Sequence, residues 1–451
     1  MAVLGSNLTN GADTDGGSGS STASVAPASN NLILLTVNSR TGITADPNQP
    51  TATGNGLTWV VVNSVVYDTT SASRRRITVF RAMGAAPSAG AIAIDFGGQA
   101  QTTVQWSVDQ FSGVDTSGAN GAGAVVQSVT NLDESVLNTT FTVTLAAFAS
   151  TANATFGGFA TSGADDITVG SGFTALSIRE TVVDLNTATE WKATNDTSVD
   201  ITTAVASVFG GVALEIRAEI IQFDAATNSG YKSAAAEPDG IYSWSHTVST
   251  GSNRYLVVGV SMLSVAGSSV TGITYNSVAM TFIGAVASVS GAIRSELWGL
   301  VAPATGANTV EVTLSAALDS AAGAVSFTGV NQSLPFEAYN SATATNVGAA
   351  DATVNVTTVA DNDWVVDCVA TSDTAITVGA GQTQRNNVTG ALGSGAMSTE
   401  GPKTPAGAVT MSWTDVGAAA TWSIGAVGLR DVNASGAGGQ IGTRALLGVG
   451  I

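Results

Sequence analysis

Hydrophobic and polar residues alternate with a period of two along much of the chain. Ile92, Ile94 and Phe96 alternate with Ala93 and Asp95. Alternation of this kind predicts β-strands that bury one face and expose the other. Turn-forming Gly, Asn, Asp and Pro separate such segments about every 8–12 residues. No stretch keeps the 3.6-residue period of an amphipathic helix for more than about two turns. The pattern therefore predicts an all-β protein.

Three short motifs occur twice, each time 216 residues apart, which indicates a tandem duplication. The copies are Gly-Leu-Thr-Trp at 56–59 and Gly-Ile-Thr-Tyr at 272–275, Pro-Ser-Ala-Gly at 87–90 and Pro-Ala-Thr-Gly at 303–306, and Phe-Ser-Gly-Val-Asp at 111–115 and Phe-Thr-Gly-Val-Asn at 327–331. These matches place repeat 1 at residues 1–218, with a Gly/Ser-rich N-terminal approach at 5–28, and repeat 2 at 219–431. Residues 432–451 form a C-terminal tail without a counterpart in repeat 1.

Each repeat has room for about eight to ten strands, which fits one two-sheet sandwich, most simply a jelly roll. The predicted fold is therefore two tandem, duplicated jelly-roll-like β-sandwich domains with extended terminal arms. We expect Phe111 and Phe327 to occupy equivalent buried positions, because they begin the same motif.

The charge balance excludes two classes of partner. Lys and Arg number 15 against 33 Asp and Glu, which gives a net charge of −18. Nucleic acids and anionic lipids both require surplus cations, so we expect neither as a partner. No apolar run reaches the ~18 residues of a membrane helix, and no basic residue precedes Arg40 as a signal peptide would require. These features predict synthesis in a cytoplasm without a secretory signal.

The sequence offers few candidates for catalysis. Cys368 and His246 are the single cysteine and histidine, so neither has the imidazole partner that nucleophilic or acid–base catalysis commonly uses. We expect both to be structural. Glu215 and Glu219 flank Arg217, but no strand carries the closely spaced carboxylates of a sandwich glycosidase. We therefore expect no enzymatic activity and no cofactor.

Calcium is the ligand that the sequence leaves open. Oxygen-rich segments of the sort calcium accepts occur at Asp13–Gly16, Asp165–Asp166 and Asp361–Asp363. None has the spacing of an EF-hand loop, and a solvated turn is the simpler interpretation of each.

Two groups of residues are candidates for contact with other proteins. Arg74, Arg75 and Arg76 form the single basic cluster and could pair with an acidic neighbouring subunit. The tail ends in an apolar segment, which we expect to lie against another chain because a free monomer gains nothing from exposing it. Its apolar residues are Ile441, Leu446, Leu447, Val449 and Ile451. Trp191, in a polar stretch, is the best candidate for a surface aromatic, although packing in the core is the favoured interpretation.

With these repeated motifs and termini, the chain resembles phage virion structural proteins built from tandem jelly-roll sandwiches. The Met-Ala-Val-Leu start followed by a Gly/Ser/Thr-rich approach and the three repeated motifs carry the resemblance. These motifs mark strands and turns, so the resemblance transfers no catalytic or ligand residue. It implies location in the virion and a role as a capsid decoration, fibre or tail appendage. The expected partners are other virion proteins or copies of the same chain.

Two other functions compete with a structural role. The first is a glycan-binding module used in host or surface attachment, and the second is a polysaccharide-degrading enzyme. The absence of paired carboxylates on one strand argues against the enzyme.

Overall fold

The computed structural model describes residues 3–163, 166–180, 185–263, 266–345, 351–415 and 420–432, except for the side chains of residues 135, 136 and 415. The chain divides into two compact units, unit 1 (Met1–Glu219) and unit 2 (Ile220–Ile451). In the described residues the secondary structure is β-strand apart from one 3-10 turn, so the all-β prediction is confirmed.

Unit 1 contains two successive sets of strands, which we call module 1 and module 2. Module 1 consists of β1 (Leu4–Asp13), β2 (Gly19–Ser21), β3 (Leu32–Arg40), β4 (Thr51–Gly54), β5 (Val60–Tyr67), β6 (Arg75–Ala82), β7 (Ile92–Asp95) and β8 (Thr103–Ser112). Module 2 consists of the 3-10 turn η1 (Ala119–Gly121), β9 (Val125–Thr144), β10 (Ala154–Thr161), β11 (Thr168–Val169), β12 (Thr174–Arg179), β13 (Asn186–Lys192) and β14 (Ser198–Ile216).

Unit 2 contains two further sets, module 3 and module 4. Module 3 consists of β15 (Gln222–Lys232), β16 (Ile241–Val248), β17 (Tyr255–Met262), β18 (Val270–Tyr275), β19 (Val278–Ala279), β20 (Thr281–Ala287), β21 (Arg294–Val301), β22 (Gly306–Leu314) and β23 (Ser320–Thr328). Module 4 consists of β24 (Phe336–Ala344), β25 (Ala352–Thr357), β26 (Asp363–Thr371), β27 (Ile376–Val378), β28 (Thr383–Gly390), β29 (Gly393–Lys403), β30 (Ala408–Asp415) and β31 (Trp422–Leu429).

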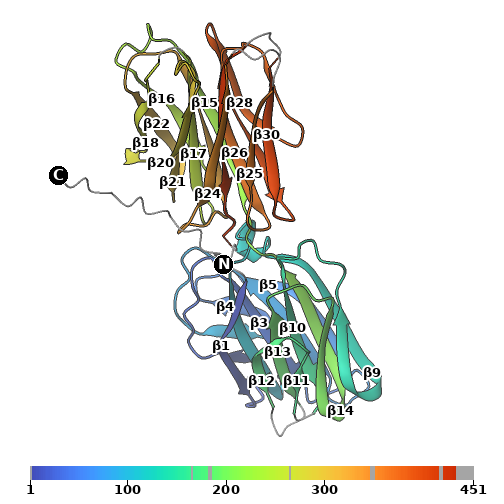
Figure 1. Ribbon diagram of the computed structural model, residues 1–451. Coiled ribbons are helices and arrows are strands. Elements are labelled where there is room, and N and C mark those ends of the chain that lie inside the picture. The colour runs from blue at the N-terminus through green and yellow to red at the C-terminus, as the bar shows by residue number, and fades with distance from the viewer. Residues whose placement is uncertain are drawn as a thin grey trace, which may run out of the picture. The chain divides into compact units, whose positions relative to one another are not determined.

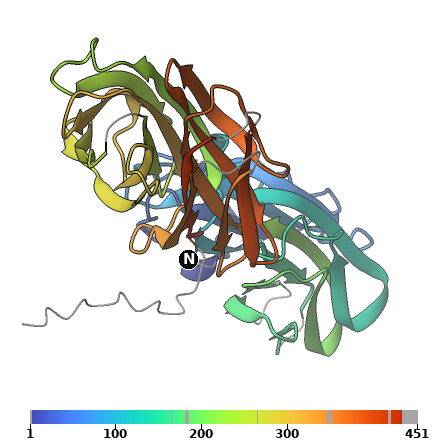
Figure 2. The same ribbon diagram turned by 45° about the horizontal axis from the view of Figure 1, so that its top comes forward.

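All four modules have the same antiparallel strand order. If the strands of module 1 are numbered in sequence, one sheet has the order 1-8-3-6-5 and the other the order 2-7-4. Modules 3 and 4 repeat both orders, with β19 as a small addition to the second sheet of module 3. In module 2 the long strands β9 and β14 each take two places, because their register shifts near Asp133 and Ser207 and each continues from the larger sheet into the smaller one. The teal strand β9 and its partner β14 run side by side in Figure 1, and Figure 2 shows the curve of β9.

Each unit is therefore a stack of four sheet layers rather than one two-sheet sandwich. In Figure 1 the layers of unit 2 are seen nearly edge-on, in the order β22, β17, β26 and β30. Three apolar clusters separate them: one between the sheets of module 3, one between the sheets of module 4, and one between β17 and β26, where the two five-stranded sheets face each other. Unit 1 has the corresponding three clusters. The five-stranded sheets are covered on both faces. Central strands such as β3 and β17 are therefore buried along almost their whole length. The finer jelly-roll assignment stays a prediction.

The facing five-stranded sheets of a unit form what we call its middle interface. Phe111 of β8 and Phe327 of β23 are fully buried there, as expected from the repeated motif. Strand pairing shows which residues of the two units correspond. Leu32 pairs with Phe111 in unit 1 and Tyr255 pairs with Phe327 in unit 2, so Leu32 corresponds to Tyr255.

The predicted extended N-terminal arm is wrong. Residues 5–28 contain β1, which pairs with β8, and β2, which pairs with β7. The segment has few large apolar residues, and the backbone pairing of its strands holds it in place together with Leu8 and Val25, which pack into the core of module 1. Asn7 adds a hydrogen bond from Nδ2 to Asp109 (2.8 Å). Gly11 lies so close to the ring of Trp106 that a side chain there would overlap it. A polar, glycine-rich sequence is thus what this edge strand requires.

Candidate functional site

The arginine cluster faces its own unit. Arg75 is buried and forms an ion pair with Asp68, and Arg74 Nη1 lies 2.6 Å from Asp46 Oδ1. Arg76 Nε donates to the backbone oxygen of Pro47 (2.7 Å). The guanidinium of Arg75 thus neutralises a buried carboxylate of its own unit, and its contact with a partner stays a prediction. Arg74 and Arg76 are already engaged within the unit, which weakens the same prediction for them.

The oxygen-rich segments are turns whose carboxylates accept backbone hydrogen bonds. Asp13 accepts from the backbone N–H of Asp15 (2.9 Å) and from Ser20 Oγ (2.8 Å). Asp363 is buried and accepts from Ala360 N and Asp431 N, both at 2.8 Å. Asp165 lies outside the described residues. Among the residues that the structure describes, no cluster of three acidic, His or Cys side chains could hold a metal ion.

His246 belongs to a hydrogen-bonded network between the two sheets of module 3. Its Nδ1 lies 2.9 Å from Thr227 Oγ1 and its Nε2 3.1 Å from Ser326 Oγ, which donates to Asp224 (2.8 Å). Burial lowers the pKa of His246 to about 4, against the opposing effect of Asp224. A serine, histidine and aspartate thus lie together, but the aspartate bonds to the serine instead of orienting the imidazole as in a catalytic triad. The network holds two sheets together.

The other candidate catalytic groups are also structural. Cys368 is fully buried in the middle interface of unit 2, and burial raises the pKa of its thiol to about 12. Glu215 is buried and accepts from Gln127 (2.7 Å), Asn153 (2.6 Å) and the N–H of Ala149 (3.0 Å). Trp191 packs edge-on against Phe111 with ring centroids 6.2 Å apart, so it is a core residue, as the favoured interpretation had it.

Two of the hollows on the described surface lie in unit 2, and the sequence did not single them out. The first, which we call the polar cleft, has a volume of about 250 Å³ on the smaller sheet of module 3. Thr274, Asn308, Thr309 and Glu311 line it together with the turn of Asn276 and Ser277. Both turn residues have positive φ (50° and 64°), which is costly for serine. Hydroxyl, amide and carboxylate groups converge there.

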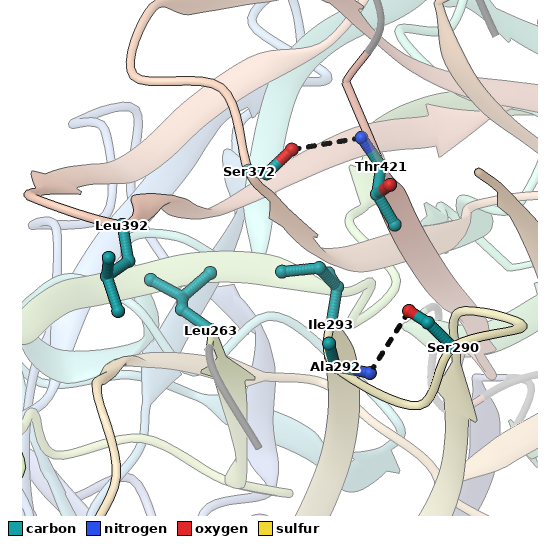
Figure 3. A pocket seen from close by; sticks show the side chains of 7 residues that line it. All are labelled: Leu263, Ser290, Ala292, Ile293, Ser372, Leu392 and Thr421. Carbon is teal, nitrogen blue, oxygen red and sulfur yellow. Dashed lines mark hydrogen bonds between the residues drawn. The ribbon is translucent and has the colours of Figure 1, made fainter. Parts of the chain in front are cut away.

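The second, which we call the apolar hollow, has a volume of about 330 Å³ and lies where modules 3 and 4 meet at one end of the middle interface. Its lining residues are Leu263, Ser290, Ala292, Ile293, Ser372, Leu392 and Thr421. Figure 3 shows Leu263 and Ile293 near its centre and Leu392 on the module 4 side, with a hydrogen bond from the N–H of Thr421 to Ser372 Oγ (3.0 Å).

The corresponding place in unit 1 is charged. Leu32 corresponds to Tyr255, so Ser39 and Met262, each seven residues further along, also correspond. Ser39 pairs with Arg76 and Met262 pairs with Arg294, so these two arginines are equivalent. The residues before them, Arg75 and Ile293, are therefore equivalent as well. By the same register, Ala292 corresponds to Arg74 and Leu263 to Arg40. The three consecutive arginines are visible in the sequence, but the hollow lined by Ala292 and Ile293, the equivalents of Arg74 and Arg75, is not.

Comparison with known proteins finds no matching family model, no matching curated protein and no matching solved structure. In the described part of the chain, no helix is long and apolar enough to span a membrane. The predicted tail contacts, Ile441, Leu446, Leu447, Val449 and Ile451, lie outside the described residues.

Proposed function

We propose that this chain is a non-enzymatic structural component of a phage particle, which docks on the capsid or tail surface as a decoration or appendage protein. The observation that carries the proposal is the fourfold use of one strand order, packed in pairs through a continuous apolar middle interface. Repetition of one rigid module is an economical way to extend a surface without building a new fold. The sequence resemblance to tandem-sandwich virion proteins points the same way.

The state of the reactive groups agrees with this role. His246 has both ring nitrogens within hydrogen-bond distance of hydroxyl groups, and Cys368 is buried with a raised pKa. A nucleophile or general base requires the opposite, namely access and a pKa near the working pH.

The experiment that tests the proposal is localisation. Purified particles are labelled with a gold-conjugated antibody against the chain and imaged, and their protein content is identified by mass spectrometry. We expect label at regular sites on the head or tail and a fixed copy number per particle. Absence of the chain from purified particles would refute the proposal. Turnover in a panel of polysaccharides that disappears on substitution of one carboxylate would refute its non-enzymatic part.

A glycan-binding function is the second candidate, and the polar cleft favours it. Sugar hydroxyls bind to carboxylates and amides, which Glu311 and Asn308 supply. Nearby in the sequence, Phe282 is 48% exposed and packs against Trp298 with ring centroids 5.3 Å apart. A glycan array tests this function, with Glu311→Gln as the variant. Binding that Glu311→Gln does not change would place the glycan elsewhere.

A further inference from the structure

The apolar hollow of unit 2 has the chemistry of a docking site for an uncharged peptide. Leu263, Ile293 and Leu392 supply apolar walls, and none of the described residues that line it is charged. In unit 1 the residues equivalent to Ile293 and Ala292 form the Arg75–Asp68 and Arg74–Asp46 ion pairs, and Asp133 and Glu134 line a hollow beside the equivalent turn. The two units therefore differ at this end in the charge of the side chains, and the uncharged lining follows from the residues of unit 2.

Apolar residues at two turns extend this surface outward. Val289 precedes Ser290 in the turn between β20 and β21 and is 87% exposed. Leu392 lies in the two-residue turn between β28 and β29, where Gly390 pairs with Gly393, and is 45% exposed. Turns of this kind usually carry polar residues. Exposed apolar residues beside a hollow are typical of an interaction surface.

The hollow also offers a group that can recognise a peptide backbone. Ser372 Oγ accepts the N–H of Thr421, so the hydroxyl can direct its own hydrogen toward an incoming carbonyl oxygen. An extended segment with apolar side chains satisfies both features: its side chains enter the hollow and its carbonyl groups accept hydrogen bonds at the rim.

We propose that the apolar hollow binds residues 441–451 of a second copy of this chain. That segment contains Ile441, Leu446, Leu447, Val449 and Ile451, and its single charged residue is Arg444. The seven residues after Arg444 carry no charged side chain, so their side chains can be buried against an uncharged wall without leaving a charged side chain unpaired. The segment and the hollow thus match in charge and in apolar character.

The position of the described C-terminal end favours a second copy over the same chain. Val432 donates its N–H to Gly329, at the end of the middle interface where Tyr255 pairs with Phe327. The hollow lies at the opposite end of β17, about 25 Å away at ~3.3 Å per residue. The segment cannot return along β31 as an added strand, because β24 and β26 already occupy both sides of β31. A head-to-tail arrangement of copies avoids this obstruction.

Two measurements on the purified chain test the proposal. Sedimentation compares the full chain with a variant that lacks residues 436–451, and fluorescence anisotropy measures binding of a labelled peptide of residues 438–451 to that shortened variant. We expect the full chain to associate as its concentration rises and the shortened chain to remain monomeric with an unchanged melting temperature. We expect the peptide to bind the shortened chain, and Leu392→Asp to weaken this binding at least about tenfold, because a carboxylate then lines the rim.

Leu334→Asp is the matched control, because Leu334 is a leucine of similar exposure (41%) in the loop that follows β23. It should leave peptide binding unchanged. Equal binding to the Leu392→Asp variant, or no binding at all, would overturn the site. Peptide binding together with a full chain that stays monomeric would identify the chain's own segment as the occupant and overturn the second-copy assignment. None of these results depends on where the chain is located in a particle, so they are independent of the proposed virion role.

Discussion

The two units bring equivalent strands to one end of their middle interfaces and line that end with opposite chemistry. In unit 1, Arg75 is 4% exposed and is neutralised by Asp68. In unit 2 the equivalent residue is Ile293, beside a hollow with exposed leucine and valine at its rim. One backbone arrangement thus accepts either an ion pair or apolar side chains. The fold therefore does not fix which side chains line this end of a unit, and their chemistry can differ between the two units.

The largest expected effect comes from removing the buried cation. Arg75→Ala leaves Asp68 without its partner in a poorly hydrated site, and we expect a loss of about 3–5 kcal/mol in the free energy of unfolding. Ile293→Ala, at the equivalent place, only enlarges an existing hollow and should cost about 2 kcal/mol. Urea unfolding measures both variants. Equal losses would show that the Arg75–Asp68 pair is not the element that distinguishes the two ends.

The dependence of stability on pH gives the next largest effect. Burial raises the pKa of Asp109 to about 6 and of Glu190 to about 8 in unit 1, and the pKa of Asp367 to about 7 in unit 2. The folded state then holds protons that the unfolded state releases above about pH 4, so each group stabilises the fold at low pH and this contribution is lost as pH rises through its folded pKa. The limiting slope is about 1.4 kcal/mol per pH unit for each group.

His246 acts in the opposite direction and only in unit 2. Its folded pKa of about 4 lies below the ordinary value, so it destabilises unit 2 as pH falls from about 6.5 toward 4. Melting temperatures between about pH 5 and 8 should therefore fall with rising pH, and Asp367→Asn should flatten part of that slope. A melting temperature that rises steadily over this range would contradict the raised carboxyl pKa values.

A smaller effect is expected when unit 1 is converted toward the chemistry of unit 2. Arg75→Ile combined with Asp68→Asn removes both buried charges, so neither partner is left as the unpaired ion that makes the single substitution costly. We expect the double variant to unfold within about 1 kcal/mol of the parent chain, again by urea unfolding. A loss as large as that of Arg75→Ala alone would mean that the ion pair is required for this end of unit 1 to close.

The smallest effect is expected for the exposed pair. Arg74 and Asp46 have side chains 32% and 47% exposed, and such surface pairs contribute about 0–1 kcal/mol. Arg74→Ala should therefore change the free energy of unfolding by less than about 1 kcal/mol, with a smaller difference at high salt. A larger loss would indicate that Arg74 supports the loop around Asp46 through contacts other than the ion pair.

The sequence alone determined that the protein is all-β and that short motifs recur in the same order in its two halves. Period-two alternation, as in Ile92, Ile94 and Phe96, follows directly from the geometry of a strand with one buried face. The motif at 111–115 resembles its copy at 327–331, and the two phenylalanines are buried in the equivalent middle interfaces of unit 1 and unit 2.

The tertiary structure decided how many sandwiches each repeat contains. Strands such as β3 and β17 are apolar on both faces, which fits a central strand of one sandwich as well as the middle layer of a four-layer stack. Only the position of the second five-stranded sheet distinguishes the two. The relation between modules 1 and 2 is also hidden in the sequence, because β9 and β14 merge strands that are separate in module 1.

Tertiary structure also decided what the conspicuous residues do. Three consecutive arginines on an acidic protein suggested an external partner, yet Asp68 and Asp46, brought close by turns and a loop, satisfy two of them. The apolar hollow joins Leu263, Ile293 and Leu392, which lie as much as 129 residues apart in the chain. No local pattern announces such a site, because its walls come from turns of two modules that meet only when the five-stranded sheets pack face to face.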